Sequence, residues 1–363
     1  MKGTAISRSI GRLKFGLFAG LPALLVAAIA IPFLLWWNGD ARRLERGKAA
    51  NQKAWREAQS HSDPNDPDAE FVDPREGIWH ALVTKASHPL YGWHEAATLR
   101  PGFLEVDSKG YQFYRSSLNT GAPIKPKRML IVGASVAFGT YASRIETTYF
   151  HLLGRGLEAR QTPFDIDIFA ARAWKSSQEI EALKQAIKEQ HYDVVLILDG
   201  LNDVICGTTA EARYGEKVAI PDGSAWEVQS HLHDYEKRVR LYLRNIQQAS
   251  ELCKAAKSRC VIALQPPLFE KTPRSRTEED ILLESLRPHK SLQAVKECYQ
   301  SIRTGLVAQA QAGSIQFIDV SRIYDGESRT VFADIWHFAD FGHRRLAEQL
   351  AAKIKIEDDN RRK

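Results

Sequence analysis

Residues 129 to 139 read MLIVGASVAFG, an apolar run that ends in a Gly133-Ala134-Ser135 turn. An uncharged run of this length predicts a strand that is buried on both faces. The turn would present the hydroxyl of Ser135 at the carboxyl end of that strand, where open parallel sheets carry their reactive groups. A lone serine in such a turn is also a common helix N-cap, so its meaning depends on the rest of the chain.

The same pattern of strand and helix repeats toward the C-terminal end. Strands are predicted at 129–133, 165–170, 193–198, 260–265 and 315–320, and helices at 146–160, 177–190, 234–257, 291–312 and 341–356. Buried strands joined by helices favour an α/β fold with a doubly wound, five-stranded parallel sheet. Two longer segments, 206–233 and 266–290, follow strand ends where substrate-contacting loops belong.

Two further segments supply groups that complement a serine. Asp334 and His337 stand three residues apart before the last predicted helix, so one turn can point both side chains the same way. His337 would accept the proton of Ser135, and Asp334 would orient the imidazole ring and stabilise the imidazolium. Asn202, after the third strand, would donate its amide to an oxyanion beside the backbone N–H of Ser135. Taken singly, these residues are also ordinary caps, turns and surface side chains.

The three segments resemble blocks I, III and V of the SGNH (GDSL-like) hydrolase superfamily, over about residues 129 to 356. Gly200-Leu201-Asn202-Asp203 is similar to its G-x-N-D block, and Asp334-Ile335-Trp336-His337 to its D-x-x-H block. The resemblance implies a flavodoxin-like sheet and Ser-His-Asp chemistry on esters, thioesters or acylated sugars. It also implies that no metal or organic cofactor takes part.

The chain departs from that family pattern at two positions. Ala134 stands where members usually have Asp, which alters the support of the turn more than its chemistry. In the second block, the alignment anchored on Ser176, Ser177 and Gln178 puts Ala173 where a glycine N–H joins the oxyanion hole. Alanine keeps this N–H, and we expect it to serve provided that its backbone is not left-handed. The expected site comprises Ser135, His337 and Asp334 as the catalytic triad, with Ser135, Ala173 and Asn202 as the oxyanion hole.

Other side chains give weaker indications. Arg172, Trp174 and Trp336 would line an acyl or sugar pocket, although aromatic side chains at a sheet edge more often pack in a core. The histidines lack metal-ligand spacing and no Cys-x-x-Cys pair occurs, so we expect no metal. Cys253 and Cys260 flank a predicted helix-to-strand turn, where either a short disulfide or two separate thiols fit.

An N-terminal apolar run indicates a membrane anchor. Residues 15–37 contain 23 uncharged, mostly apolar residues, enough for a helix to cross a bilayer, and they follow a basic tail at 1–14. We expect a single-pass inner-membrane protein with its catalytic domain in the periplasm, and a cleaved signal peptide is the alternative. The numbers of Lys and Arg on the two sides of the run do not decide the orientation.

The chain between this run and the first strand divides into two parts. Residues 38–70 combine a polar helix at 40–59 with a linker rich in Pro and Asp. Residues 71–128 are predicted to form a cap with a hairpin, which packs on the domain at 129–356. A charged tail at 357–363 ends the chain.

Composition limits the functional classes. With 363 residues, 44% hydrophobic and 26% charged, the chain is long enough for one α/β domain and its attachments. Its formal charge of +6 comes from scattered Lys and Arg. No basic stripe interleaved with aromatic residues occurs, which argues against nucleic-acid binding.

The sequence therefore predicts a membrane-anchored serine enzyme that acts on acylated, in particular acetylated, envelope or exported carbohydrate. Water as the acyl acceptor makes an esterase or deacetylase, and a sugar hydroxyl makes an O-acyltransferase; the triad does not separate the two. The alternative is a catalytically inactive scaffold or binding subunit of an envelope or polysaccharide-export complex, because fold does not fix function. The departures at Ala134 and Ala173 favour this alternative, and the complete Ser-His-Asp set opposes it.

Overall fold

The computed structural model describes residues 45–60, 83–88, 92–98, 106–119, 125–205, 235–286 and 292–355. The chain divides into two compact units, Met1–Ala49 and Ala50–Lys363. Of the first unit, only residues 45–49 are described, and they begin a helix at 45–60. The features below lie in the second unit.

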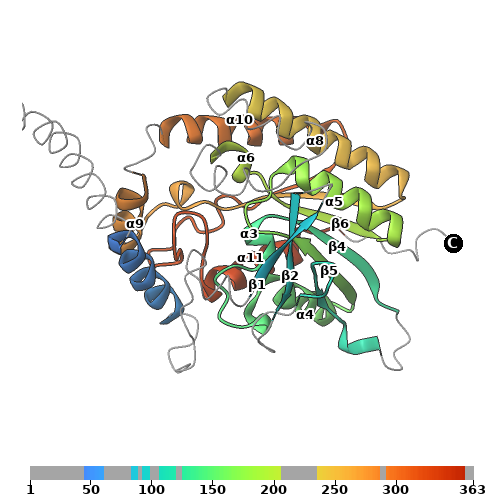
Figure 1. Ribbon diagram of the computed structural model, residues 1–363, viewed down its shortest axis with the longest axis horizontal. Coiled ribbons are helices and arrows are strands. Elements are labelled where there is room, and N and C mark those ends of the chain that lie inside the picture. Colours follow the sequence, from blue (N-terminus) through green and yellow to red (C-terminus); the bar gives the residue numbers. More distant parts are fainter. Residues whose placement is uncertain are drawn as a thin grey trace, which may run out of the picture. The chain divides into compact units, whose positions relative to one another are not determined.

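A six-stranded sheet forms the core of the second unit (Figure 1). Its strands are β3 (Tyr111–Tyr114), β4 (Lys127–Gly133), β5 (Phe164–Ala170), β6 (Val194–Asp199), β7 (Arg259–Leu264) and β8 (Gln316–Asp319). Their spatial order is β3-β5-β4-β6-β7-β8, and β4 to β8 are parallel. These five strands have the 2-1-3-4-5 order of flavodoxin-like, doubly wound sheets. The predicted parallel core of the α/β fold is therefore confirmed.

The predicted five-stranded parallel sheet is wrong at its edge, where β3 adds a sixth, antiparallel strand. Tyr111 of β3 lies opposite Phe169 of β5, and Tyr114 lies opposite Ile166. The sequence predicts a separate cap for these residues, because a four-residue run carries no information about its pairing partner. Stacking of the Tyr111 and Phe169 rings, with centroids 4.3 Å apart, accompanies the pairing. The predicted hairpin is formed by β1 (Val83–His88) and β2 (Gly92–Thr98), which pair antiparallel.

Helices cover both faces of the sheet (Figure 1). One face carries α4 (Tyr149–Ala159) and α11 (Asp340–Lys353), and the other carries α5 (Ser176–Glu189), α8 (Tyr235–Ala255) and α10 (Leu292–Gln311). The side chains of successive strand residues pack on opposite faces of the sheet. Ile131 belongs to the hydrophobic cluster with α4 and α11, whereas Val132 belongs to the cluster with α5, α8 and α10. These parallel strands and helices end within three residues of their predicted ends.

Short elements follow the carboxyl ends of the parallel strands. They are α3 (Ser135–Phe138) after β4, α6 (Asn202–Ile205) after β6, and η4 (Leu268–Glu270) with α9 (Arg276–Leu286) after β7. Two single turns, η1 (Ser117–Asn119) and η2 (Ile145–Thr147), lie elsewhere. The predicted loop at 266–290 therefore contains a helix, α9. The other predicted loop, 206–233, lies outside the described residues.

The helix at 45–60 lies where the sequence predicts a polar helix at 40–59, but it is not a solvated spacer. One face of its second-unit part is buried, at spacings of three and four residues. The buried side chains are Asn51, Ala54, Trp55, Ala58 and Gln59. This part of the helix therefore belongs to the packed domain.

The predicted membrane span at 15–37 lies outside the described residues, as do the basic tail at 1–14, the linker after residue 60 and the tail at 357–363. In the part of the chain that the structure describes, no helix has both the length and the apolar character needed to cross a bilayer. Membrane anchoring and orientation stay predictions.

The structure contains thiols, not a disulfide, at Cys253 and Cys260. Both are buried, at the end of α8 and in β7. A hydrogen bond between the two thiols, together with burial, raises the pKa of Cys260 well above its usual value. Of the two alternatives left by the sequence, the structure has the free thiols, and it places them in contact.

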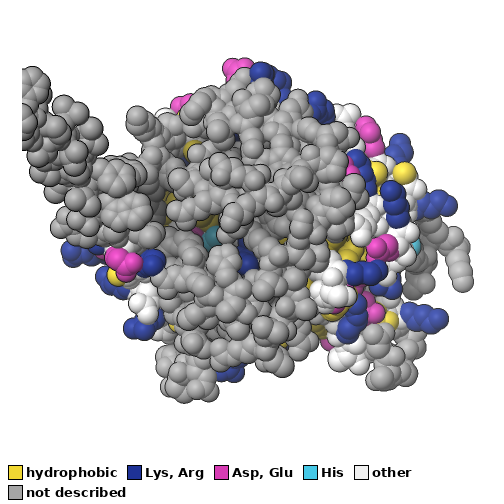
Figure 2. Space-filling view, in the orientation of Figure 1, with side chains coloured by type: hydrophobic (Ala, Val, Ile, Leu, Met, Phe, Trp, Pro, Cys, Tyr) yellow, Lys and Arg dark blue, Asp and Glu magenta, His cyan; other side chains and the backbone are white. Residues whose placement is uncertain are grey.

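The surface charge of the described residues is mixed. Figure 2 shows Lys and Arg side chains interspersed with Asp and Glu on the visible face. Among the described residues, some opposite charges pair along helices, as in Arg240 with Glu236 and Lys184 with Glu181. The view shows one face only, so the expectation that the chain binds no nucleic acid stays a prediction.

The backbone of Leu198 lies so close to Gly133 that there is no room for a side chain at this position. A Cβ there would lie 2.4 Å from the carbonyl oxygen of Leu198 and 2.6 Å from Cβ of Ala137. Gly133→Ala is therefore expected to lower the free energy of unfolding by about 1 to 3 kcal/mol, as overpacking does. In the control Gly156→Ala, the new Cβ meets only Ala351, at 3.6 Å, and α4 gains roughly 0.5 to 1 kcal/mol. Urea denaturation measures both; equal stabilities of the two variants would contradict this packing.

Candidate active site

Ser135, His337 and Asp334 lie in contact with one another. Ser135 is the first residue of α3, and its Oγ lies 2.7 Å from Nε2 of His337. On the opposite side of the imidazole ring, Nδ1 lies 2.8 Å from Oδ2 of Asp334. A proton on Nδ1, facing the carboxylate, leaves the lone pair of Nε2 to accept a proton from the serine hydroxyl. The three groups therefore have the geometry of a nucleophile, a general base and an orienting acid.

The spacing of Asp334 and His337 follows from a closed turn. Oδ1 of Asp334 accepts the backbone N–H groups of Trp336, at 2.7 Å, and His337, at 2.8 Å. In return, the carbonyl oxygen of His337 accepts the N–H groups of Ala333 and Asp334. The carboxylate thus shapes the turn with Oδ1 and holds the imidazole with both oxygens, since Nδ1 of His337 also lies 3.0 Å from Oδ1.

The turn that carries Ser135 closes without an aspartate at position 134. Ala134 is buried, and its carbonyl oxygen accepts the N–H of Phe138 at 2.9 Å. The carbonyl oxygen of Ser135 accepts the N–H of Thr140 at 3.1 Å. Backbone hydrogen bonds therefore support this turn.

Asn202 and Ala173 lie on loops that flank the serine turn, because β4 lies between β5 and β6. The amide Nδ2 of Asn202 donates to the carbonyl oxygen of Trp174 at 2.8 Å, which joins the two loops and orients the amide. Ala171 is tied to the serine strand, since its N–H donates to the carbonyl oxygen of Gly133 at 3.3 Å. The three predicted oxyanion donors thus lie at the ends of three adjacent parallel strands.

Ala173 has a left-handed backbone, with a φ of 66°. The expectation that this backbone is not left-handed, on which the role of its N–H depended, is therefore not met. Left-handed geometry is the one that glycine adopts freely, and alanine holds it here at a cost of about 1 to 2 kcal/mol. The residue is exposed. Within the described residues, the N–H groups of Ser135 and Ala173 donate to no other protein group, so both are available to an oxyanion.

Asp203 also joins the loop of Asn202 to the loop of Ala173. Its carboxylate accepts the backbone N–H of Ser176 at 3.0 Å and the hydroxyl of Ser176 at 2.5 Å.

Near this contact, Glu179 and Asp199 are buried beside each other. Burial raises the pKa of Asp199 to about 6, although hydrogen bonds from Glu179 and Tyr242 oppose the shift. Burial, together with the charge of Asp199, raises the pKa of Glu179 well above its usual range.

The aromatic residues near the site differ in their roles. Trp174 is fully buried and packs edge-to-face on Phe169, with centroids 5.5 Å apart, so its side chain belongs to the core and not to a pocket wall. Trp336 is partly buried against both hydrophobic clusters. Arg172 is largely buried, with 8% of its surface exposed.

Sequence reasoning missed two residues beside the triad. The ring of Tyr141 lies 5.6 Å from the ring of His337, and its backbone has a φ of 72°. Asp340, three residues after His337, accepts hydrogen bonds from Ser143 and Thr147. An acidic residue at the start of the last predicted helix, three residues after His337, is the signal in the sequence that could have indicated a role for Asp340. No sequence pattern predicts a tyrosine with a left-handed backbone, because this geometry depends on tertiary contacts.

Among the described residues, no group of three or more His, Cys, Asp and Glu side chains is placed to hold a metal ion. The absence of a metal or cofactor stays a prediction. What the arrangement offers chemically is a serine hydroxyl, a base, a buried acid and N–H donors, which together suit acyl transfer through a covalent serine ester.

Several solved structures resemble this chain at low identity. A catalytic mutant of Axe2, an acetylxylan esterase from Geobacillus stearothermophilus, is 13% identical, with 64% of this chain and 97% of that chain covered and a TM-score of 0.45. The acetyl xylan esterase AlAXEase is 16% identical, with coverages of 63% and 100% and a TM-score of 0.42. The psychrotrophic esterase EstA from Pseudoalteromonas sp. is 13% identical, with coverages of 63% and 96% and a TM-score of 0.38.

No family model matches the chain, and no curated protein matches it. Likenesses at these identities and TM-scores carry no functional argument. Any function must therefore be argued from the residues of this chain.

The left-handed geometry of Ala173 predicts how glycine substitutions will act. In Ala173→Gly, relief of strain offsets the greater freedom of glycine in the unfolded chain, so the free energy of unfolding should be unchanged or rise by up to about 1 kcal/mol. Ala171→Gly, two residues away at a buried site without positive φ, should lose about 1 kcal/mol. Chemical denaturation of both variants tests this contrast, and equal losses in the two would contradict it.

Proposed function

We propose that this chain is a serine acyl-ester hydrolase or O-acyltransferase of the SGNH (GDSL-like) type. The observation that carries the proposal is the position of His337 between Ser135 and Asp334, 2.7 Å from the hydroxyl and 2.8 Å from the carboxylate. Three oxyanion donors on adjacent strand ends support the same reading.

In the proposed mechanism, Oγ of Ser135 attacks the ester carbonyl while Nε2 of His337 takes the hydroxyl proton. Asp334 stabilises the imidazolium through the proton on Nδ1. The backbone N–H groups of Ser135 and Ala173, with the amide of Asn202, stabilise the tetrahedral oxyanion. As the intermediate collapses, His337 gives its proton to the leaving alcohol, and the acyl group stays on Ser135.

The second half of the reaction decides the enzyme class. His337 takes a proton from the acceptor, and the acceptor oxygen attacks the acyl-serine. As the bond from the acyl carbon to Oγ breaks, His337 returns the proton to Oγ, and Ser135 is regenerated. Water as the acceptor gives hydrolysis, and a sugar hydroxyl gives transfer. We propose acetylated carbohydrate as the substrate class. This choice rests on the family resemblance and on the predicted envelope location.

One experiment tests the chemistry and the fate of the acyl group together. Wild-type protein is expected to release acetate from a chromogenic acetyl ester, and Ser135→Ala is expected to lose about 10³-fold or more of kcat/KM. Ser301→Ala, at a surface serine on α10, is the matched control and should keep full activity. The assay is repeated with a panel of oligosaccharides, and acetylated products are sought by mass spectrometry.

Acetylated oligosaccharide formed by wild type and not by Ser135→Ala would identify a transferase. Acetate release that stays the same when oligosaccharides are added, with no acetylated oligosaccharide formed, would identify a hydrolase. A folded wild-type protein that releases no acetate with or without acceptor would contradict the proposal and favour the scaffold alternative.

We further propose that residues 15–37 anchor the protein in the inner membrane, with the domain in the periplasm, where envelope or polysaccharide-export partners would be accessible. The support is the length and apolar character of the run. Fusions of the C-terminal end to alkaline phosphatase and to green fluorescent protein test the orientation. We expect phosphatase activity from the first and no fluorescence from the second; the reverse result would place the domain in the cytoplasm.

A further inference from the structure

The helix at 45–60 contacts the loops that carry the candidate triad. Trp55 and Ala58 pack in one hydrophobic cluster with Tyr141, Ala333 and Ala339. Tyr141 follows the serine turn, and the two alanines flank the turn of Asp334 and His337. Because the cluster is fully buried, the helix is a structural neighbour of both catalytic loops.

The first polar contact of this helix reaches the serine loop. Nε1 of Trp55 donates to the carbonyl oxygen of Tyr141 at 3.2 Å. Tyr141 has a left-handed backbone, which a bulky side chain adopts only when its surroundings hold it. Its ring packs on His337, with centroids 5.6 Å apart. Trp55 therefore bonds to the residue whose ring contacts the candidate base.

Two further side chains of the helix, Glu57 and Gln59, reach both ends of the segment 330–340, which contains Asp334 and His337. Before the triad turn, the carboxylate of Glu57 accepts the hydroxyl groups of Thr330 and, at 2.6 Å, of Thr277 at the start of α9. After it, Nε2 of Gln59 donates to Oδ2 of Asp340 at 2.6 Å. The helix thus makes hydrogen bonds to this segment at two positions, four residues before Asp334 and three residues after His337.

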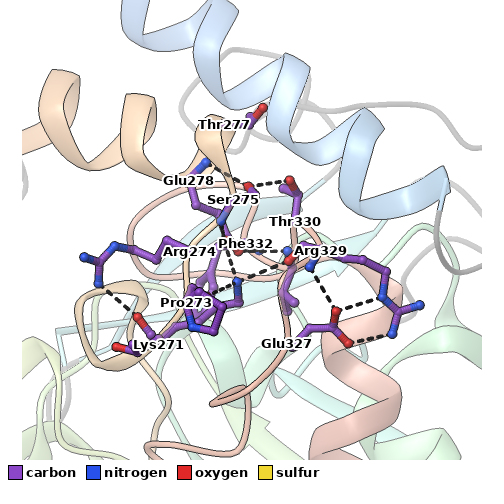
Figure 3. A network of polar contacts seen from close by, with 12 residues as sticks. Lys271, Pro273, Arg274, Ser275, Thr277, Glu278, Glu327, Arg329, Thr330 and Phe332 are labelled. Carbon is purple, nitrogen blue, oxygen red and sulfur yellow. Dashed lines mark hydrogen bonds and ion pairs between the residues drawn. The ribbon is translucent and has the colours of Figure 1, made fainter.

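A buried ion pair holds the same segment from α9. Glu278 pairs with Lys271 at 2.5 Å, and both side chains are almost fully buried. The carboxylate of Glu278 also accepts the N–H groups of Val331, at 2.9 Å, and Phe332, at 3.2 Å. Figure 3 shows this network, in which Thr277 and Thr330 lie on the side of the pale blue helix. Through Thr277 and Thr330, Glu57 therefore links the helix to the segments that Glu278 also contacts.

We propose that Trp55, Glu57 and Gln59 are positioning residues of the triad. They touch neither the substrate nor the reacting atoms, and they hold the 330–340 segment and Tyr141 so that His337 stays in reach of Ser135. The role rests on the proposed function, since it concerns the geometry of that reaction. Its consequence is that residues 50–60 of this helix are a required part of the catalytic domain.

Glu57→Ala is the main test, assayed with p-nitrophenyl acetate. It removes both threonine contacts, and a small shift of His337 should lower kcat by about 10- to 100-fold while KM changes less than about two-fold. Glu57→Gln keeps an acceptor and should recover most of kcat. Arg56→Ala, at the exposed neighbouring position of the same helix, is the matched control and should behave as wild type.

Hydrogen exchange supplies a readout that does not depend on activity. In Glu57→Ala, peptides that cover 329–340 should exchange faster, whereas peptides from β4 and β6 should keep the wild-type rate. Should Glu57→Ala fail to fold, Gln59→Ala replaces it under the same criteria, because Asp340 there retains its bonds from Ser143 and Thr147.

A folded Glu57→Ala protein with wild-type kcat would overturn the positioning role and leave the esterase proposal intact. A loss of kcat that Glu57→Gln does not recover, with unchanged exchange at 329–340, would also overturn it. A wild-type protein that hydrolyses no ester would overturn the proposed function itself, and the two failures are thus distinguishable.

Discussion

The carboxylate of Asp340 joins the two loops on which the candidate site depends. Ser135 and His337 are 202 positions apart in sequence, yet their side chains must stay within hydrogen-bond distance. Asp340, at the start of α11, accepts the N–H of Ser143 at 2.8 Å and the hydroxyl of Thr147 at 2.9 Å, both from the chain that follows the serine turn. Because this carboxylate is buried and bonded on several sides, a small displacement of either loop would leave a buried charge unsatisfied.

The parallel sheet determines which residues meet at this place. β4 lies between β5 and β6, so the turn with Ser135 is flanked by the loops with Ala173 and Asn202. Close approach requires a particular residue at each strand end. Gly133 leaves room for the carbonyl of Leu198, and Ala173 adopts a geometry that glycine would take without strain. The strain at Ala173 is of the kind that persists where surrounding contacts over-determine the backbone.

Sequence patterns predict the alternating strands and helices of this structure, and they miss the parts that depend on single long-range contacts. The parallel strands and their helices were predictable, because burial on both faces leaves uninterrupted apolar runs. The contact between Asp334 and His337 was predictable from their spacing. The pairing of β3 was not, since YQFY carries no sign of its partner, nor was the role of Glu57, whose bonding partners Thr277 and Thr330 lie 220 and 273 positions away.

The most direct measurement of the central claim, that Ser135 is a nucleophile activated by His337, is covalent labelling with a fluorophosphonate followed by peptide mass spectrometry. We predict a single adduct on the peptide that contains Ser135, formed by wild type and lost in a folded His337→Ala variant. Absence of any adduct on folded wild-type protein, or an adduct on a different residue, would contradict it.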